Sequence, residues 1–190
     1  MSDETIQVKG FAVRGLLKYI KESGHPGGIP AVLARLDPAL GAHFATRILS
    51  SRWYPYEMFL GLLHTIDDEI GDGDLSLMPT LGESSGRQDA GTIFRFVAAL
   101  SSVESIVRRA DFLWQRYCDR GRFEVLELEP GRLHLALEEF PEIDQAHCGL
   151  ITGWIAGLGK AVGARWPEVE QVRCVHRGDP RCEFGATWQT

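Results

Sequence analysis

The stretch Cys174-Val175-His176-Arg177-Gly178-Asp179-Pro180-Arg181-Cys182-Glu183-Phe184 holds two of the four cysteines in this chain of 190 residues. We interpret Pro167 to Trp188 as two strands that turn around Gly178, because clusters of Gly, Asp and Pro mark turns between strands. In such a hairpin Cys174 and Cys182 are equally far from the turn, and their Cβ atoms should lie about 5 Å apart across the ladder. That distance suits two cysteines that bind the same metal ion, and it is also close to the geometry of a disulfide.

The preceding part of the chain extends this pattern. Apolar and polar residues alternate with period two on either side of Pro130-Gly131, in Phe123–Glu129 and in Arg132–Glu138. This pattern predicts a hairpin with one packed face and one solvent-exposed face. A helix is expected from about Ile143 to Ala164. The half from about residue 121 to 190 therefore consists of hairpin, helix and hairpin. We predict an α+β fold with an antiparallel sheet of about four to five strands covered by helices.

The half from about residue 1 to 120 is predicted to be mostly helical after a short strand at 7–10. The expected helices are 11–21, 29–36, 40–51, 55–70, 92–100 and 103–117. The last of these is the clearest, with apolar residues at intervals of three and four and a capping box from Ser101 to Glu104. Gly82 to Gly91 is rich in Gly and Ser and predicts a loop. The acidic run 67–74 is interpreted as a solvated helix end and turn, because its order of ligands does not fit a calcium loop.

Composition bounds the class of protein. With 44% apolar and 24% charged residues, the chain should form one globular domain spanning 1–190. The net charge of −6, without clustered Lys and Arg, argues against a nucleic-acid partner. No secretory signal or stretch long enough for a membrane span is found, so a cytoplasmic location is expected. In that reducing compartment a thiolate metal site is favoured over a disulfide, with free buried thiols as the other alternative.

The run Cys148-Gly-Leu-Ile-Thr-Gly-Trp-Ile-Ala-Gly-Leu158, then Cys174, then Gly178–Phe184 resembles the 4-vinyl-reductase domain superfamily. It looks most like the zinc-bearing branch in the sensor domains of bacterial transcription activators that respond to aromatic compounds. In that branch a cysteine opens a helix, a second follows after 26 residues, and a third lies eight further across a turn. Here the intervals are 148 to 174 and 174 to 182, so both match. The whole chain also resembles an uncharacterised paralogous family from myxobacteria, which implies no activity.

This resemblance implies a structural Zn²⁺ site held by Cys148, Cys174 and Cys182. The fourth ligand stays open, because those sensors place a glutamate where this chain has Gln171, and a neutral amide is a weak zinc ligand. Strand alternation would place Gln171 on the face opposite Cys174, so a bulge is needed for it, or for its neighbour, to reach the ion. The candidates for the fourth ligand are Gln171, Glu170, His176 and His147.

The sensor resemblance further implies an apolar pocket for a small hydrophobic or aromatic ligand between the helices and the sheet. The same residues would also suit an ordinary core. The expected pocket residues are Phe94, Phe112, Trp114, Tyr117 and Trp154.

The resemblance implies a homodimeric, cytoplasmic small-molecule sensor that acts on a protein partner in trans. The alternative is a scaffold or protein-interaction module that has kept the cysteine clip and lost the pocket. A tetrapyrrole-related enzyme is the third hypothesis, and fold analogy alone is a weak warrant for it. No catalytic residues are assigned and no enzyme is expected, because no paired carboxylates or nucleophile–base set stand at recognisable spacing. The superfamily is related in fold to haem nitric-oxide sensors, but the chain has no Tyr-x-Ser-x-Arg signature to hold haem propionates.

Overall fold

The computed structural model describes residues 5–93, 102–140 and 143–189. The first half contains β1 (Gln7–Lys9), α1 (Gly10–Glu22), α2 (Gly28–Leu33), α3 (Pro38–Gly41), the 3₁₀ turn η1 (Ala42–Phe44), β2 (Trp53–Pro55), α4 (Tyr56–Ile70) and α5 (Met78–Ile93). The second half contains α6 (Val103–Val107), α7 (Ala110–Trp114), β3 (Arg122–Glu129), β4 (Arg132–Glu138), α8 (Gln145–Ala161), β5 (Arg165–Arg173), the 3₁₀ turn η2 (Val175–Arg177) and β6 (Cys182–Gln189). The mixed α+β fold predicted from the sequence is confirmed.

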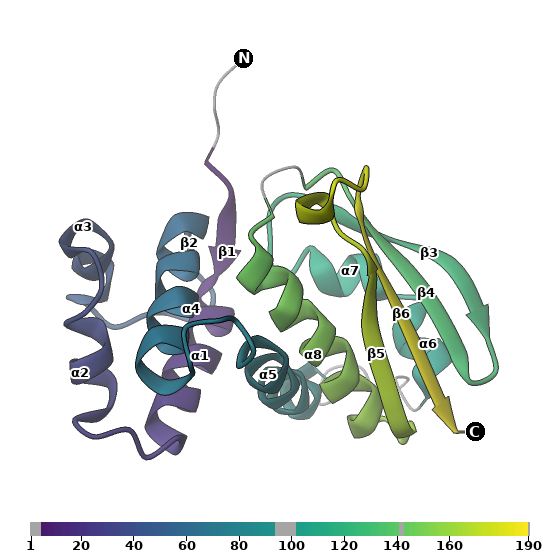
Figure 1. Cartoon of the computed structure of the whole chain (residues 1–190), viewed down its shortest axis with the longest axis horizontal. Coiled ribbons are helices and arrows are strands. Elements are labelled where there is room, and N and C mark those ends of the chain that lie inside the picture. The colour runs from purple at the N-terminus through teal and green to yellow at the C-terminus, as the bar shows by residue number, and fades with distance from the viewer. Residues whose placement is uncertain (1–4, 94–101, 141–142, 190) are drawn as a thin grey trace.

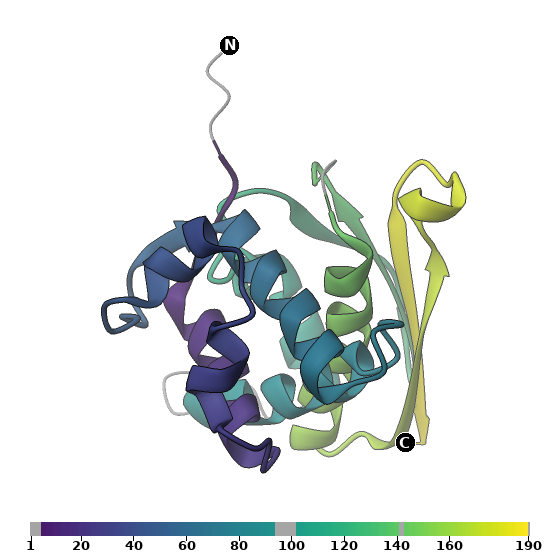
Figure 2. The ribbon, with the colours of Figure 1, turned by 60° about the vertical axis from the view of Figure 1, so that its left-hand side comes forward.

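The larger sheet is antiparallel, with four strands in the order β3-β4-β6-β5. Leu133, Leu135 and Leu137 of β4 point to the packed face and are each 4% exposed, as period-two alternation requires. Figure 2 shows the helices gathered on one side of this sheet, with α8 next to it. The predicted hairpin at 123–138 is confirmed by the β3–β4 ladder, in which Phe123 pairs with Leu137.

The rest of the first half, helices α1 to α4, lies on the side of α5 and α8 that faces away from the larger sheet (Figure 1). Its interior is built by α1 and α4, whose residues Val13, Ile20, Leu62 and Ile66 are fully buried. β1 pairs with β2 and connects the two halves, because the Lys9 amide donates to the Tyr117 carbonyl at 2.8 Å. One hydrophobic core therefore extends through both halves of the described chain.

Helix α5 corrects the prediction of a loop from Gly82 to Gly91. These glycines lie on a helix that crosses α8 at backbone contact. A Cβ at Gly82 would stand 2.0 Å from the Leu150 carbonyl oxygen, and a Cβ at Gly153 of α8 would stand 1.8 Å from the Pro79 carbonyl oxygen. Gly82 and Gly86 of α5 and Gly153 of α8 are thus required by a close helix–helix approach, which outweighs their low helix propensity.

The long helix predicted at 103–117 is also corrected. It is two short helices, α6 and α7, separated at Arg109, whose φ of −119° and ψ of 16° are not helical. The capping box is formed by Ser102 and Ser105, one residue later than expected at its start. Apolar spacing of three and four is satisfied by two successive short helices as well as by one, so the pattern could not reveal the break. The helix expected at 92–100 lies largely outside the described residues.

The C-terminal hairpin has the predicted strands but a wider connection. Cys174 lies beyond the β5 ladder and precedes η2, while Cys182 pairs with Leu137 of β4. The β5–β6 register is irregular between Gln171 and Arg173. Arg173 pairs with Glu183, so Cys174 and Cys182 are opposite each other just beyond the end of the ladder, and a bulge of the expected kind lies next to them.

Candidate functional site

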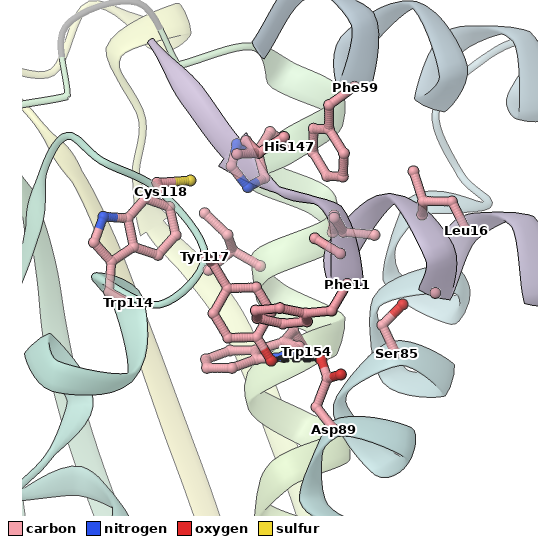
Figure 3. Close-up of a pocket in the computed structure, with 15 residues that line it drawn as sticks. Phe11, Leu16, Phe59, Ser85, Asp89, Trp114, Tyr117, Cys118, His147 and Trp154 are labelled. Atoms are coloured by element: carbon pink, nitrogen blue, oxygen red, sulfur yellow. Dashed lines mark hydrogen bonds between the residues drawn. The ribbon is translucent and has the colours of Figure 1, made fainter. Parts of the chain in front are cut away.

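A small cavity lies at the junction of the helical half and α8. It has a volume of about 50 Å³ and is lined mainly by α1, α5, the 114–118 segment and α8. Most of the lining is apolar. The lining residues are Val8, Phe11, Ala12, Gly15, Leu16, Phe59, Ser85, Asp89, Trp114, Tyr117, Cys118, His147, Leu150, Ile151 and Trp154. Figure 3 shows the aromatic side chains of Phe11, Tyr117 and Trp154 next to one another, beside Asp89.

Three side chains form a hydrogen-bonded cluster at this cavity. The Tyr117 hydroxyl donates to Asp89 Oδ2 at 2.5 Å, and Trp154 Nε1 lies 3.1 Å from both Asp89 Oδ2 and the Tyr117 hydroxyl oxygen. Each residue comes from a different element, namely α5, the segment after α7, and α8. The cluster therefore joins three parts of the chain by polar contacts inside an apolar surrounding, where hydrogen bonds are strong.

The carboxyl group of Asp89 has no cationic partner among the residues that the structure describes. Burial raises the pKa of Asp89 from 3.8 to about 6, against the opposing effect of its two hydrogen-bond donors. Burial, followed by the nearby Asp89 charge, raises the pKa of the Tyr117 hydroxyl well above its usual value. Tyr117 is thus a neutral donor across the physiological range, and Asp89 is the group of this cluster that titrates near neutrality.

His147 lies on the opposite wall of the cavity, in the first turns of α8. Its Nδ1 atom is 2.8 Å from the Tyr56 hydroxyl, which also accepts a hydrogen bond from the Asp144 amide. With one lone pair of the Tyr56 oxygen taken by that amide, the Tyr56 proton can be donated to Nδ1, which favours the tautomer protonated at Nε2. Burial lowers the pKa of His147 to about 4, so the imidazole is neutral at physiological pH.

The pocket residues predicted from the sequence are only partly brought together. Trp114, Tyr117 and Trp154 line the cavity. Phe112 does not, and this prediction is corrected: its side chain is 52% exposed, beneath the Arg116 guanidinium. Phe94 lies outside the described residues. Sequence reasoning missed Asp89, because it fell in a segment interpreted as a loop.

The second cluster consists of Cys148, Cys174 and Cys182. All three are buried, and their Sγ atoms lie within 4.8 Å of one another. Cys148 Sγ is 3.6 Å from Cys182 Sγ. The hydrogen bond with Cys182, together with burial, raises the pKa of Cys148, whereas the hydrogen bond from Cys148 lowers the pKa of Cys182. Cys182 is thus the thiol of this pair that ionises more readily.

The structure places the four candidates for a fourth ligand in different environments. Gln171 lies beside Cys148, where its side-chain amide opposes the rise in the pKa of that thiol. Glu170 lies on the other face of the strand, against Gly185. His176 Nε2 is 2.8 Å from the Ile143 carbonyl oxygen, and His147 belongs to the cavity. Within the described chain, the group that could hold a metal contains the three cysteines alone.

Comparison with solved structures identifies the fold. An H-NOX protein from S. oneidensis in the Fe(II)NO ligation state matches with a TM-score of 0.74 at 12% identity, covering 96% of this chain and 99% of that chain. An unliganded Fe(II) H-NOX protein from K. algicida matches with a TM-score of 0.65 at 12% identity, over 96% of this chain and 97% of that one. A variant of T. tengcongensis H-NOX gives 0.66 at 11% identity, over 96% and 98%. No family model and no curated protein matches the sequence. The chain thus has the H-NOX fold, and at this level of identity the likeness shows the fold alone.

These matches correct two expectations. The resemblance to the 4-vinyl-reductase superfamily is wrong, because the matching structures are H-NOX proteins. Zinc was implied by that resemblance and is overturned with it, since the matching structures concern iron and haem. The intervals between the cysteines reflect the lengths of α8, β5 and the turn, and so they indicate a fold rather than a bound ion. No helix in the described residues is long and apolar enough to cross a membrane.

Proposed function

We propose that this chain is a sensor module of H-NOX fold that binds a small molecule in the cavity beside Asp89, Tyr117 and Trp154. The observation that carries the proposal is the position of this cavity. Its walls come from α1 and α5 of the first half and from the 114–118 segment and α8 of the second. A ligand that enters there contacts both halves at once, so binding would favour one relative arrangement of the halves over another.

Haem is the group that the matching structures concern, and the residues that line this cavity do not fit it. The cavity of about 50 Å³ is far below the roughly 300 Å³ or more that a drug-sized ligand occupies. The described residues that line it include no Lys or Arg that would pair with propionates, and the carboxyl group of Asp89 would repel them. His147 is a single neutral imidazole whose Nδ1 is engaged by Tyr56. The ligand of this proposal is therefore small and is not a porphyrin.

The output of such a module would pass to a protein partner in trans, with the chain acting as a homodimer and without turnover chemistry. This part extends the sensor proposal, and the absence of turnover chemistry is supported by the groups that line the cavity. Tyr117 and His147 are both neutral at physiological pH, and each has its polar atom engaged by another side chain. The lining also contains the Ser85 hydroxyl and the Cys118 thiol, but neither is hydrogen-bonded to a base in the described residues and burial raises the pKa of Cys118, so these groups are suited to holding a ligand.

The test uses a variant that fills the cavity. Gly15 lines it, and a Cβ at this position would meet only Ser85 Oγ, at 3.7 Å. Gly15→Leu should occupy the space, whereas Gly15→Ala is the matched control that leaves most of it open. A library of small neutral and charged compounds is screened by thermal shift and native mass spectrometry against the wild type and both variants.

A ligand at about 100 times its dissociation constant should raise the melting temperature of the wild type and Gly15→Ala by about 5–10 °C. Gly15→Leu should show no such rise. Compounds that stabilise Gly15→Leu as strongly as Gly15→Ala would place the binding elsewhere. A complete absence of ligands would leave an interaction module as the function.

A further inference from the structure

The polar cluster and its aromatic neighbours indicate which sign of charge a ligand of the cavity carries. This inference rests on the proposed function of the cavity. Asp89 Oδ2 accepts from both Tyr117 and Trp154, while Oδ1 has no hydrogen-bond donor from the residues that the structure describes. An ionised carboxylate in an apolar site is costly unless a cation or several donors compensate it. Two donors on one oxygen compensate it only in part. The remaining oxygen is the position for a donor supplied by a ligand.

Three aromatic rings stand around this carboxyl group. The Phe11 and Tyr117 rings meet edge to face with centroids 4.6 Å apart, and the Tyr117 and Trp154 rings do the same at 5.0 Å. Figure 3 shows these rings gathered above Asp89. Aromatic faces carry negative potential and attract organic cations, most strongly where water is excluded. The carboxylate and the rings thus favour the same sign of charge in a ligand.

We propose that the cavity binds a small alkylammonium ion, whose N–H group donates to Asp89 and whose alkyl groups contact Phe11, Tyr117 and Trp154. The volume sets the size. At about 10–15 Å³ for each water-sized group, the 50 Å³ cavity holds about four non-hydrogen atoms. Isopropylammonium has this size and shape. Anionic ligands are excluded by Asp89, and neutral ligands of equal shape leave the carboxylate without its counter-charge.

The experiment compares two probes of matched shape, isopropylammonium and isopropanol, in an amine-free buffer near neutral pH. Ligands of this size bind with dissociation constants no better than about 0.1 mM, so titration followed by NMR is the suitable method. The indole N–H resonance of Trp154, assigned with Trp154→Phe, reports on the site itself because Nε1 donates to Asp89. Isopropylammonium should bind about thirty-fold more tightly than isopropanol.

Two variants assign the preference to Asp89. Asp89→Asn keeps the shape and removes the charge, and it should reduce the thirty-fold preference to a few-fold. Glu83→Gln removes a carboxylate from the same helix that does not line the cavity, and it should keep the full preference. Thermal melting of each variant establishes that it is folded before titration. The comparison of the two probes on the wild type tests the inference even if Asp89→Asn does not fold.

The outcomes separate this inference from the proposed function. Equal affinities for the two probes, with the Trp154 resonance shifting in both titrations, would overturn the alkylammonium proposal and leave a ligand-binding cavity. A preference that survives in Asp89→Asn would also overturn it. If neither probe moves the Trp154 resonance and no library compound distinguishes Gly15→Leu from Gly15→Ala, both proposals are overturned.

Discussion

Asp89→Asn should change the pH dependence of stability as well as ligand preference. Burial raises the pKa of Asp89 from 3.8 to about 6 in the folded chain. Between these values the folded state binds a proton that the unfolded state has lost, so the stability of the wild type falls as pH rises through this window. Below about pH 3.8 the carboxyl group is neutral in both states and contributes no penalty. Above about pH 6 it is ionised in both, and the folded state carries the full cost of burying the charge.

The magnitude follows from the difference between the two pKa values. At 1.36 kcal/mol for each pKa unit the full cost is about 3 kcal/mol, of which about 2 kcal/mol develops between about pH 4 and about pH 8. Asparagine carries no charge at any pH. The free energy of unfolding of Asp89→Asn, minus that of the wild type, should therefore grow by about 2 kcal/mol over this range. His147 also titrates here, but it is present in both proteins and cancels in the difference.

Urea denaturation followed by circular dichroism, repeated at several pH values, measures this quantity. The same substitution at Asp72 is the matched control, because that carboxylate is exposed and stays hydrated in the folded state. A gap between Asp89→Asn and the wild type that does not change with pH would refute the reasoning. It would mean that the Asp89 carboxyl is solvated, or that an unrecognised cation compensates it.

Three further predictions address other features of the molecule. Burial lowers the pKa of His147 to about 4, so the wild type should lose stability as pH falls from 6.5 through 4, and His147→Gln should lose less; acid titration followed by fluorescence gives the two midpoints. Gly153→Ala should destabilise the fold by about 3 kcal/mol in thermal melts, because its Cβ would meet the Pro79 carbonyl. A Cβ at Gly91 of α5 would have no atom of the described residues within 4 Å, so Gly91→Ala should be neutral or stabilising. Mild oxidation should join Cys148 to Cys182, whose sulfurs are 3.6 Å apart, and peptide mapping should find that link in the wild type and not in Cys148→Ser; a preferred link to Cys118 would contradict this geometry.

The strands were predictable from the sequence because apolar residues at every second position indicate a strand with one buried face. Leu133, Leu135 and Leu137 could only line one face, and the hairpin that they define is present. The convergence of the three cysteines was also predictable, since a helix and a hairpin bring those positions to one end of the sheet. Whether those cysteines bind an ion was not predictable, because cysteine spacing depends on the lengths of the elements and carries no information on metal binding.

The cavity was less accessible to sequence reasoning. Gly82, Gly86 and their neighbours resembled a loop, although only the backbone contact with α8 explains them. With that segment assigned as loop, Asp89 had no place facing the interior. Phe112 and Trp114 are two residues apart on α7, so their side chains point to opposite sides of the helix, and Phe112 is exposed where Trp114 is buried. Such errors arise where tertiary contact decides what local pattern leaves open.

Helix α8 participates in both clusters, and the glycine contact with α5 limits how it can move. With backbone atoms of the two helices touching, neither can slide past the other, so they shift as one rigid body. Trp154 at the cavity and Cys148 at the thiols are separated by about 9 Å along that body, at 1.5 Å per residue. If a guest at one end displaces this body, the sulfurs at the other end move with it, and thermodynamic reciprocity then makes the affinity for the guest depend on the oxidation state of those sulfurs.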